Sequence, residues 1–340
     1  MGKKEQYEIL YNSNGNYKGL VGRQKRGRGG QHMILSVSRR TDIPGQYADW
    51  FMNRIRAGFV LTQNPMNPAQ VQRLPLSEDT VDCIVFWTKD AAPLLPYLDE
   101  LDRLGYAYYF QFTLTPYPHA LEPGLRPKTE IVQTFRALSE RLGRERVVWR
   151  YDPILLGTGI DIAFHKQAFR ALCERLSDCT DTVTISFLDI YQKIKTVPVR
   201  PPNESETAEL AAFIGETARR YGLRATACCE AADLTVYGIS RAACIDKARI
   251  ERICGCALDL TADKNQRGMC GCSESVDIGV YDTCPNGCVY CYANRSKAAV
   301  EKHRAAYDPN SPLLCGVADE SKTYPERRVL SNKTGQTKLF

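Results

Sequence analysis

Hydrophobic and polar positions follow two different periods along this chain from residue 33 onward. Short apolar runs rich in β-branched and aromatic residues predict strands, because these residues suit a pleated, half-buried surface. The longer stretches between them repeat apolar residues at helical spacing, which predicts amphipathic helices. The predicted strands cover residues 33–38, 58–63, 82–87, 106–114, 146–151, 182–188, 223–228 and 276–281. The predicted helices cover residues 46–58, 92–105, 127–143, 162–176 and 203–222.

Regular alternation of strands and helices favours an α/β fold with a parallel sheet wrapped by helices. Eight candidate strands indicate a parallel (β/α) barrel, TIM-like, over residues 33–300. A Rossmann-type sheet is the alternative, but no G-x-G-x-x-G motif follows any predicted strand. In a barrel the last strand neighbours the first, and chemistry lies on the loops that leave the carboxyl ends of the strands. We therefore expect the polar residues at those ends to share one face.

Charge and composition divide the chain into three parts. No apolar run is long enough to cross a membrane and no signal-peptide pattern is present, so the sequence predicts a cytoplasmic protein with no membrane partner. The net charge is +6, and residues 1–32 carry most of it, with seven basic residues against two acidic ones. The glycine-rich, basic composition of residues 1–32 predicts a disordered leader. This leader either binds nucleic acid electrostatically or is a dispensable tail. Residues 301–340 are predicted to form a C-terminal extension.

Three cysteines at the end of the last predicted strand are the most specific chemical feature of the sequence. Cys284, Cys288 and Cys291 have the spacing C-x₃-C-x₂-C. In the cytosol thiols stay reduced, so clustered cysteines indicate a metal rather than disulfides. Three thiolates on a [4Fe–4S] cluster would leave one iron open to a further ligand. The alternatives are a zinc knuckle, which needs a fourth ligand, and an electron-transfer cluster.

The spacing of these cysteines, with Tyr290 before the last one, resembles the signature of radical S-adenosylmethionine (radical SAM) enzymes. The resemblance implies a [4Fe–4S] cluster that binds SAM and cleaves it to a 5′-deoxyadenosyl radical, which abstracts hydrogen from a substrate that the sequence does not identify. It also implies that Tyr290 contacts the adenine and that a flavodoxin- or ferredoxin-type partner supplies electrons. Radical SAM enzymes usually carry this loop after the first strand, so its late position implies a circularly permuted barrel.

One element of the radical SAM pattern is missing. The Gly-Gly-Glu triplet that commonly grips the SAM amino group is absent after the strand at 33–38, where "SVSRRTD" stands instead. By the same resemblance, Arg39 and Arg40 would pair with the methionyl carboxylate and Asp42 with the ammonium group. The alternative is an ordinary surface salt bridge among these three residues.

From Met33 onward the chain also resembles the uncharacterised bacterial family called domain of unknown function 1848. The resemblance rests on "SRRTDIP" at 38–44, "RYDPI" at 150–154, "CID" at 244–246 and the block that ends in "TCPNGCVYCYAN" at 283–294. The "YCYAN" ending is similar to that of spore photoproduct lyase and related radical SAM proteins. Neither resemblance implies a particular substrate.

A second group of cysteines lies in a Cys-rich insertion at about residues 228–275. Four of these thiolates would hold an auxiliary [4Fe–4S] cluster or a zinc ion, and the alternative is a set of reduced, packed thiols. The family resemblance favours Cys244, Cys270 and Cys272 with either Cys229 or Cys228. Proximity in the sequence favours the two C-x-C pairs instead, which adds Cys254 and Cys256 to Cys270 and Cys272.

Taken together, these features predict an iron–sulfur enzyme that generates an organic radical from SAM. The alternative is a non-catalytic zinc or iron–sulfur module that binds nucleic acid through its basic leader. No residue is assigned to substrate chemistry. Asp152 and Glu230 are expected to face the barrel mouth, where they either bind substrate or pair with Arg150 and Arg224.

Overall fold

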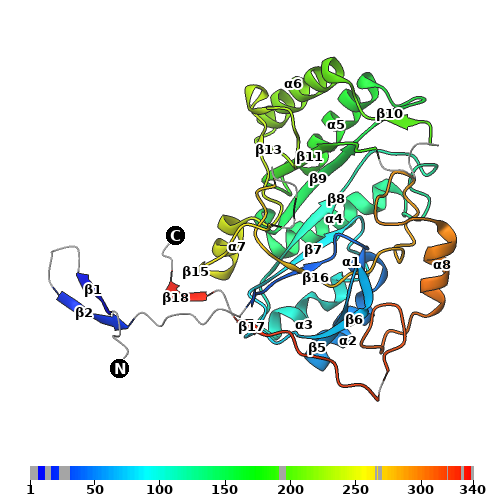
Figure 1. The fold of residues 1–340 in the computed structure, drawn as a ribbon. Coiled ribbons are helices and arrows are strands. Elements are labelled where there is room, and N and C mark those ends of the chain that lie inside the picture. Colours follow the sequence, from blue (N-terminus) through cyan, green and yellow to red (C-terminus); the bar gives the residue numbers. More distant parts are fainter. Residues whose placement is uncertain are drawn as a thin grey trace. The chain divides into compact units, whose positions relative to one another are not determined.

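The computed structural model describes residues 7–11, 17–22, 31–190, 197–264, 266, 270–319, 321–330 and 333–337 (Figure 1). The chain divides into two compact units, Met1–Gln31 and His32–Phe340. In the first unit, strands β1 (Tyr7–Tyr11) and β2 (Tyr17–Gly22) pair antiparallel. The rest of the predicted disordered leader, and all of its basic side chains, lie outside the described residues. Strand β3 covers Gln31–His32.

An eight-stranded parallel sheet forms the frame of the second unit. Its order is β14-β13-β11-β9-β8-β7-β4-β16, so the strands follow the chain except that the last one lies beside the first. Strand β16 pairs with β4 through Val276 opposite Leu35 and Asp277 opposite Ser36, which confirms the predicted neighbours. The strands are β4 (Ile34–Val37), β7 (Cys83–Thr88), β8 (Tyr108–Thr113), β9 (Val147–Ile154), β11 (Thr182–Phe187), β13 (Arg224–Ala227), β14 (Ser240–Arg241) and β16 (Val276–Asp277).

The helices that precede β14 in the chain, α1 to α6, pack on one face of this sheet. Alternate strand positions, such as Phe86, Phe110 and Trp149, form the main core with the apolar sides of these helices. From β4 to β14 every crossover steps in the same direction along the sheet, and right-handed connections then place the helices of these crossovers on one face. The helices are α1 (Ile43–Gln46), α2 (Ala48–Ala57), α3 (Leu98–Arg103), α4 (Lys128–Leu142), α5 (Ile162–Leu176) and α6 (Glu204–Arg220).

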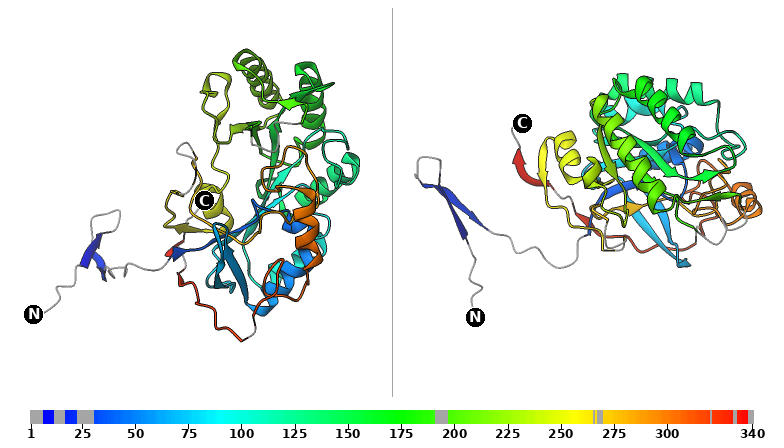
Figure 2. Two further views of the ribbon diagram at one scale, coloured as in Figure 1. Left: turned by 45° about the vertical axis from the view of Figure 1, so that its right-hand side comes forward. Right: turned by 90° about the horizontal axis from the view of Figure 1, so that it is seen from above.

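The opposite face of the sheet is covered by the Cys-rich segment, and we call it the α7 face. The remaining strand positions, such as Val85, Tyr109 and Val148, form a second core with Ile250 of helix α7 (Lys247–Cys254). Figures 1 and 2 show α7 and the chain that follows it in yellow, apart from the green helices of the main core. Side chains on the α7 face therefore lie between the sheet and the Cys-rich segment.

The predicted TIM-like barrel is wrong in its closure, because the sheet is open and β14 and β16 are its edges. The predicted strand at 58–63 does form β5 (Phe59–Asn64), but it pairs only with β6 (Asn67–Pro75), in a separate antiparallel hairpin. Each edge strand has only two residues, too few to complete a ring. The Cys-rich segment, moreover, occupies the face that a closed barrel turns inward. What remains is an open, parallel α/β sheet.

Short elements complete the described fold, and the C-terminal extension returns to the main body. Trp50 Nε1 donates to the Ser311 carbonyl oxygen at 2.9 Å, and Arg327 N donates to the Arg73 carbonyl oxygen at 2.9 Å. Among the described helices, none combines the length and apolar character that spanning a membrane requires. The short elements are η1 (Leu95–Tyr97), η2 (Arg144–Arg146), β10 (Leu156–Gly157), β12 (Val199–Arg200), η4 (Thr235–Tyr237), β15 (Cys256–Leu258), α8 (Lys297–Ala305), β17 (Val329–Leu330) and β18 (Lys333–Thr337).

Candidate metal centre

The loop of Cys284, Cys288 and Cys291, here called the edge loop, follows β16 and lies at the carboxyl edge of the sheet. Cys288 is 6% exposed, and the other two cysteines are half-buried. All three sulfurs lie within electrostatic range of one another. The backbone N–H of Cys291 donates to the Cys288 carbonyl oxygen at 3.1 Å, which tightens the turn between them. The edge loop therefore presents three thiols from one short, folded segment.

Backbone contacts with the segment after β8 fix the position of the edge loop. Gly124 N donates to the Asn286 carbonyl oxygen at 2.9 Å, and Val289 N donates to the Leu121 carbonyl oxygen at 3.0 Å. A Cβ atom on Gly124 would lie 2.5 Å from the Pro285 carbonyl oxygen and 2.7 Å from Asn286 Cα. Only glycine allows the two backbones to approach this closely.

The side chain of Asn286 connects the edge loop to the segment after β4. Its Oδ1 accepts from Gln46 Nε2 at 2.8 Å, and its Nδ2 donates to Asp42 Oδ2 at 3.1 Å. Asp42 also accepts from the backbone N–H groups of Gly45 and Lys89, both at 2.9 Å. Asp42, which the sequence assigns to the SAM ammonium group, is thus buried and holds the loop, helix α1 and the end of β7 together.

A buried ionic network holds Tyr290 in place. The carboxylate of Glu122 is 1% exposed and contacts Lys89, Lys128, Tyr290 and Thr115. Lys89 Nζ lies 2.8 Å from Glu122 Oε1 and 3.0 Å from the Tyr290 hydroxyl oxygen. Burial alone would raise the pKa of Glu122, but the two ammonium groups outweigh it and hold that pKa at about 2. The tyrosine predicted to contact adenine is therefore turned into the protein and anchors the loop.

Burial also sets the protonation of the edge-loop thiols. It raises the pKa of Cys284 above its ordinary value, and it raises the pKa of Cys288 to about 12 against the opposing effect of Lys89. Thiols in this environment stay protonated until a cation takes the place of the proton.

The two arginines assigned to the SAM carboxylate contact β16 and the α7 face. Arg40 Nη1 donates to the Gly279 carbonyl oxygen at 3.2 Å. The Arg39 backbone N–H donates to Asp277 Oδ2 at 2.8 Å, and its guanidinium carbon lies 5.2 Å from the Trp87 ring centroid. Both arginines are therefore engaged within the protein, and Arg39 points toward the second group of cysteines.

Five cysteines of the Cys-rich insertion meet on the α7 face, and we call them the thiol ring. Cys244 Sγ donates to Cys228 Sγ at 3.3 Å. Cys229, Cys270 and Cys272 lie close enough to complete the ring, because each thiol in the order Cys228, Cys229, Cys270, Cys272 and Cys244 affects the pKa of a neighbouring one. The ring brings together the cysteines that the family resemblance favours, including both members of the Cys228–Cys229 pair.

Positive charge and an aromatic ring surround the thiol ring. Arg150 is 5% exposed, and its Nη1 lies 2.9 Å from Cys244 Sγ. Its guanidinium carbon lies 5.2 Å from the Trp87 ring centroid, the same distance as that of Arg39. Burial alone would lower the pKa of Arg39, but interactions that include Cys272 and Asp277 outweigh it and raise that pKa.

The second C-x-C pair lies elsewhere. Cys254 hydrogen-bonds with Cys83 at the start of β7, and its Sγ also contacts the Asp82 carbonyl oxygen at 3.3 Å. Cys256 lies in β15, opposite β18. The grouping favoured by proximity in the sequence, Cys254 and Cys256 with Cys270 and Cys272, is therefore not the one that the structure brings together.

Two further predicted residues at the carboxyl edge have partners in the protein. Asp152 pairs with Arg150, as one of the two sequence interpretations expects. Glu230 accepts from the Phe187 backbone N–H at 2.8 Å, while Arg224 lies at the opposite end of β13. Sequence reasoning missed the role of Glu122, because it lies in an irregular segment without a motif.

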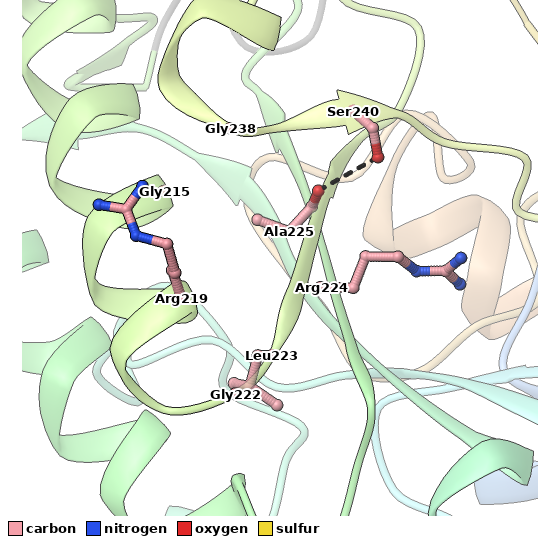
Figure 3. Close-up of a pocket in the computed structure, with 8 residues that line it drawn as sticks. All are labelled: Gly215, Arg219, Gly222, Leu223, Arg224, Ala225, Gly238 and Ser240. Carbon is pink, nitrogen blue, oxygen red and sulfur yellow. Dashed lines mark hydrogen bonds between the residues drawn. The ribbon is translucent and has the colours of Figure 1, made fainter.

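A depression of about 360 Å³, whose lining includes none of the cysteines, lies at the amino end of β13 (Figure 3). Arg219 and Arg224 extend to different sides of it, and Ser240 donates to the Ala225 carbonyl oxygen at 3.4 Å. Its lining contains no thiol, carboxylate or imidazole. In the described ranges, no three or more His, Cys, Asp or Glu side chains are arranged so that they could hold a metal ion as they stand. The lining of the depression is Gly215, Arg219, Gly222, Leu223, Arg224, Ala225, Gly238 and Ser240.

The fold and the cysteines define a parallel α/β protein with one thiol loop at its carboxyl edge and one thiol ring on its α7 face. The chain belongs to the family described as Domain of unknown function (DUF1848), whose model matches residues 34–293. No curated protein matches the chain. One solved structure that is similar is a putative alpha-L-fucosidase from Bacteroides thetaiotaomicron, with 11% identity and a TM-score of 0.24. The match covers 51% of this chain and 71% of that one.

Proposed function

We propose that this protein is an iron–sulfur enzyme in which Cys284, Cys288 and Cys291 hold a [4Fe–4S] cluster that binds SAM. The single observation that carries the proposal is the placement of the C-x₃-C-x₂-C loop at the carboxyl edge of a parallel sheet, directly after a strand that lies beside the first strand. That strand order also supports the proposed circular permutation of a radical SAM-type (β/α) fold. Catalytic loops of parallel α/β folds lie at this edge.

The residues of the edge loop fit such a cluster. The donor set is three thiols, which are the ligands that iron–sulfur clusters use. The three thiols affect one another's pKa electrostatically, and the backbone at Gly124 leaves no room for a side chain, so the loop that carries them is held closely. When bound, the cluster supplies the electron that cleaves SAM to methionine and a 5′-deoxyadenosyl radical, and an external flavodoxin- or ferredoxin-type partner restores it.

In this function the chain itself would hold the edge loop in place and balance the negative charge of the bound cluster. The Asp42–Asn286 contact and the Glu122–Tyr290 contact fix the edge loop from two sides before any cofactor binds. Preorganisation of this kind removes the cost of ordering the loop at the moment of binding. The half-buried Lys89 places a positive charge within electrostatic range of Cys288, where a cluster with thiolate ligands concentrates negative charge. Binding of the SAM carboxylate by Arg39 and Arg40 would require both side chains to exchange their present partners for the carboxylate.

Anaerobic reconstitution of the full chain with iron and sulfide, followed by dithionite and SAM, tests the proposal. We expect the product 5′-deoxyadenosine and the absorbance of a [4Fe–4S] cluster, and we expect the Cys288→Ala variant to lose both. The matched control is Cys179→Ala, because Cys179 is also buried but lies just before β11, at the amino edge of the sheet. Its activity should equal that of the unaltered protein.

The alternative, a metal module without catalysis that binds nucleic acid, predicts different results. Reconstituted protein that holds its cluster, binds SAM and releases no 5′-deoxyadenosine would contradict the enzyme. Deletion of residues 1–32 would then abolish nucleic-acid binding and flatten its salt dependence, because the leader carries most of the net charge. An iron-free protein with zinc in the edge loop would contradict the cluster itself.

A further inference from the structure

We propose that the thiol ring binds one thiophilic divalent ion, for which Zn²⁺ is the expected metal, through Cys228, Cys244, Cys270 and Cys272. This site is separate from the edge loop and does not depend on the function proposed for it. It would be a closed, structural site that ties the Cys-rich segment to the sheet, because four protein thiolates fill the tetrahedral coordination of zinc.

The short distance between two of the ring sulfurs favours a single ion over a cluster. With a Zn–S distance of about 2.3 Å, the sulfurs of a tetrahedral site lie about 3.8 Å apart. Cys228 Sγ and Cys244 Sγ lie 3.3 Å apart and are bridged by a thiol proton, so replacing protons by one ion requires only a small expansion. A [4Fe–4S] cluster places its four cysteines on four different iron atoms and keeps their sulfurs farther apart. As they stand, the described side chains do not converge as ligands, and binding would exchange the thiol protons for the ion.

The thiol ring is surrounded by N–H donors of the kind that stabilise metal-bound thiolates. Arg150 Nη1 already lies 2.9 Å from Cys244 Sγ, and the Ile245 backbone N–H donates to Cys272 Sγ at 3.4 Å. Such N–H contacts orient thiolate ligands and offset their charge. The indole N–H of Trp87, which packs in the same core, is fully buried and has no hydrogen-bond partner within the described chain. A buried donor without a partner is rare, and a thiolate of the ring would satisfy it.

The backbone around the ring holds three of its cysteines rigidly. The Cys244 carbonyl oxygen accepts from Tyr109 Oη and from Gln111 Nε2, both at 2.7 Å, so this cysteine is fixed to β8. Ser273 N donates to the Ile245 carbonyl oxygen at 3.0 Å, which joins the peptides next to Cys244 and Cys272. The third, Cys228, continues β13, because its N–H donates to the Ile185 carbonyl oxygen at 2.9 Å.

The choice between the adjacent cysteines follows from these contacts. Cys228 extends a strand, faces Arg150 and directly contacts Cys244. Cys229 has a φ of 55°, in the left-handed region, and marks the point where the chain leaves the sheet. We therefore assign Cys228 as the fourth ligand and Cys229 as a neighbour that hydrogen-bonds to the ligands. Substitution of the two adjacent cysteines makes a matched pair that tests this assignment.

Zinc and iron per chain are to be measured by mass spectrometry on the full-length protein after anaerobic purification and dialysis against EDTA. We expect one zinc that the Cys288→Ala variant retains, because that variant alters only the edge loop. Cys228→Ser should lose the zinc, and Cys229→Ser should keep it. Because a cysteine variant could fail to fold, Arg150→Lys provides a second test. It keeps all five thiols and the positive charge, and it should weaken zinc binding about 10- to 100-fold in chelator competition.

Several results would overturn the proposal of a zinc site. Each of them concerns metal content or thiol reactivity, whereas the enzyme proposal is tested separately by the formation of 5′-deoxyadenosine. Unaltered protein that holds no zinc, and whose five ring thiols react with a thiol reagent equally fast before and after EDTA, would exclude a metal site. Four irons with sulfide in Cys288→Ala would replace the single ion by a second cluster. Zinc loss from Cys229→Ser but not from Cys228→Ser would reverse the ligand assignment.

Discussion

The edge loop and the thiol ring use the same residue type in opposite ways. Among the described residues, the edge-loop thiols make no hydrogen bonds to one another and are held from outside, by backbone contacts, Asn286 and the Glu122 network. In the thiol ring, Cys244 Sγ contacts Cys228 Sγ directly, and Arg150 donates to Cys244 Sγ. A loop fixed by its surroundings can leave one position of a cluster open, whereas thiols that already touch can only enclose a small ion. The environment of the thiols, more than their number, therefore separates the two proposed sites.

Among the variants that test this comparison, we expect Glu122→Gln to lower the free energy of unfolding the most. Removing the carboxylate leaves Lys89 and Lys128 without their buried counter-charge and frees Tyr290. The pKa of Glu122 is about 2 in the folded protein against an ordinary value of 4.5, which corresponds to about 3 kcal/mol. Because the folded-state pKa is the lower one, this stability is fully present above pH 4.5 and is lost as the pH falls toward 2. Urea unfolding of both proteins at pH 7 and at pH 3 measures the difference.

The control for this variant is Glu130→Gln. Glu130 pairs with Arg126 on the surface, where an ion pair contributes about 0–1 kcal/mol. Two results would show that the Glu122 network does not hold the loop. One is that Glu122→Gln lowers the free energy of unfolding at pH 7 by no more than Glu130→Gln does. The other is that the loss caused by Glu122→Gln is as large at pH 3 as at pH 7.

A pair of glycine substitutions sharpens the comparison between the two regions. A Cβ on Gly124 would lie 2.5 Å from the Pro285 carbonyl oxygen, so Gly124→Ala must move the edge loop and should cost about 1–3 kcal/mol. A Cβ on Gly271, between two ring cysteines, would meet nothing closer than the Ala242 carbonyl oxygen at 3.3 Å. We expect Gly124→Ala to lower the iron content while zinc is kept, and Gly271→Ala to leave both unchanged. Equal iron content in the two variants would contradict a loop fixed by its backbone.

The sequence predicts the elements and the edge loop well because both depend on local pattern. Strand β16 and its cysteines stand together in the chain, and alternation alone places them at the carboxyl edge. The closure of the sheet could not be predicted, since residues 58–63 have the same apolar pattern whether they join the sheet or form the β5–β6 hairpin. Cysteine spacing alone also could not choose the ring over the two C-x-C pairs, because that choice depends on where α7 packs, although the family resemblance favours ring cysteines.

The smallest expected effect concerns the connection between the two regions, which runs through Arg39. Its carbonyl oxygen accepts from the hydroxyl of Tyr292, next to Cys291, at 2.5 Å, and its guanidinium lies toward Cys272. Tyr292→Phe removes this one hydrogen bond, and because Tyr292 is 52% exposed we expect a loss of about 0.5–1.5 kcal/mol in unfolding free energy. Both metals should remain, measured as iron and zinc per chain. If Tyr292→Phe instead released zinc from the ring, the two regions would act as one site, and the contrast drawn between an open loop and a closed ring would fail.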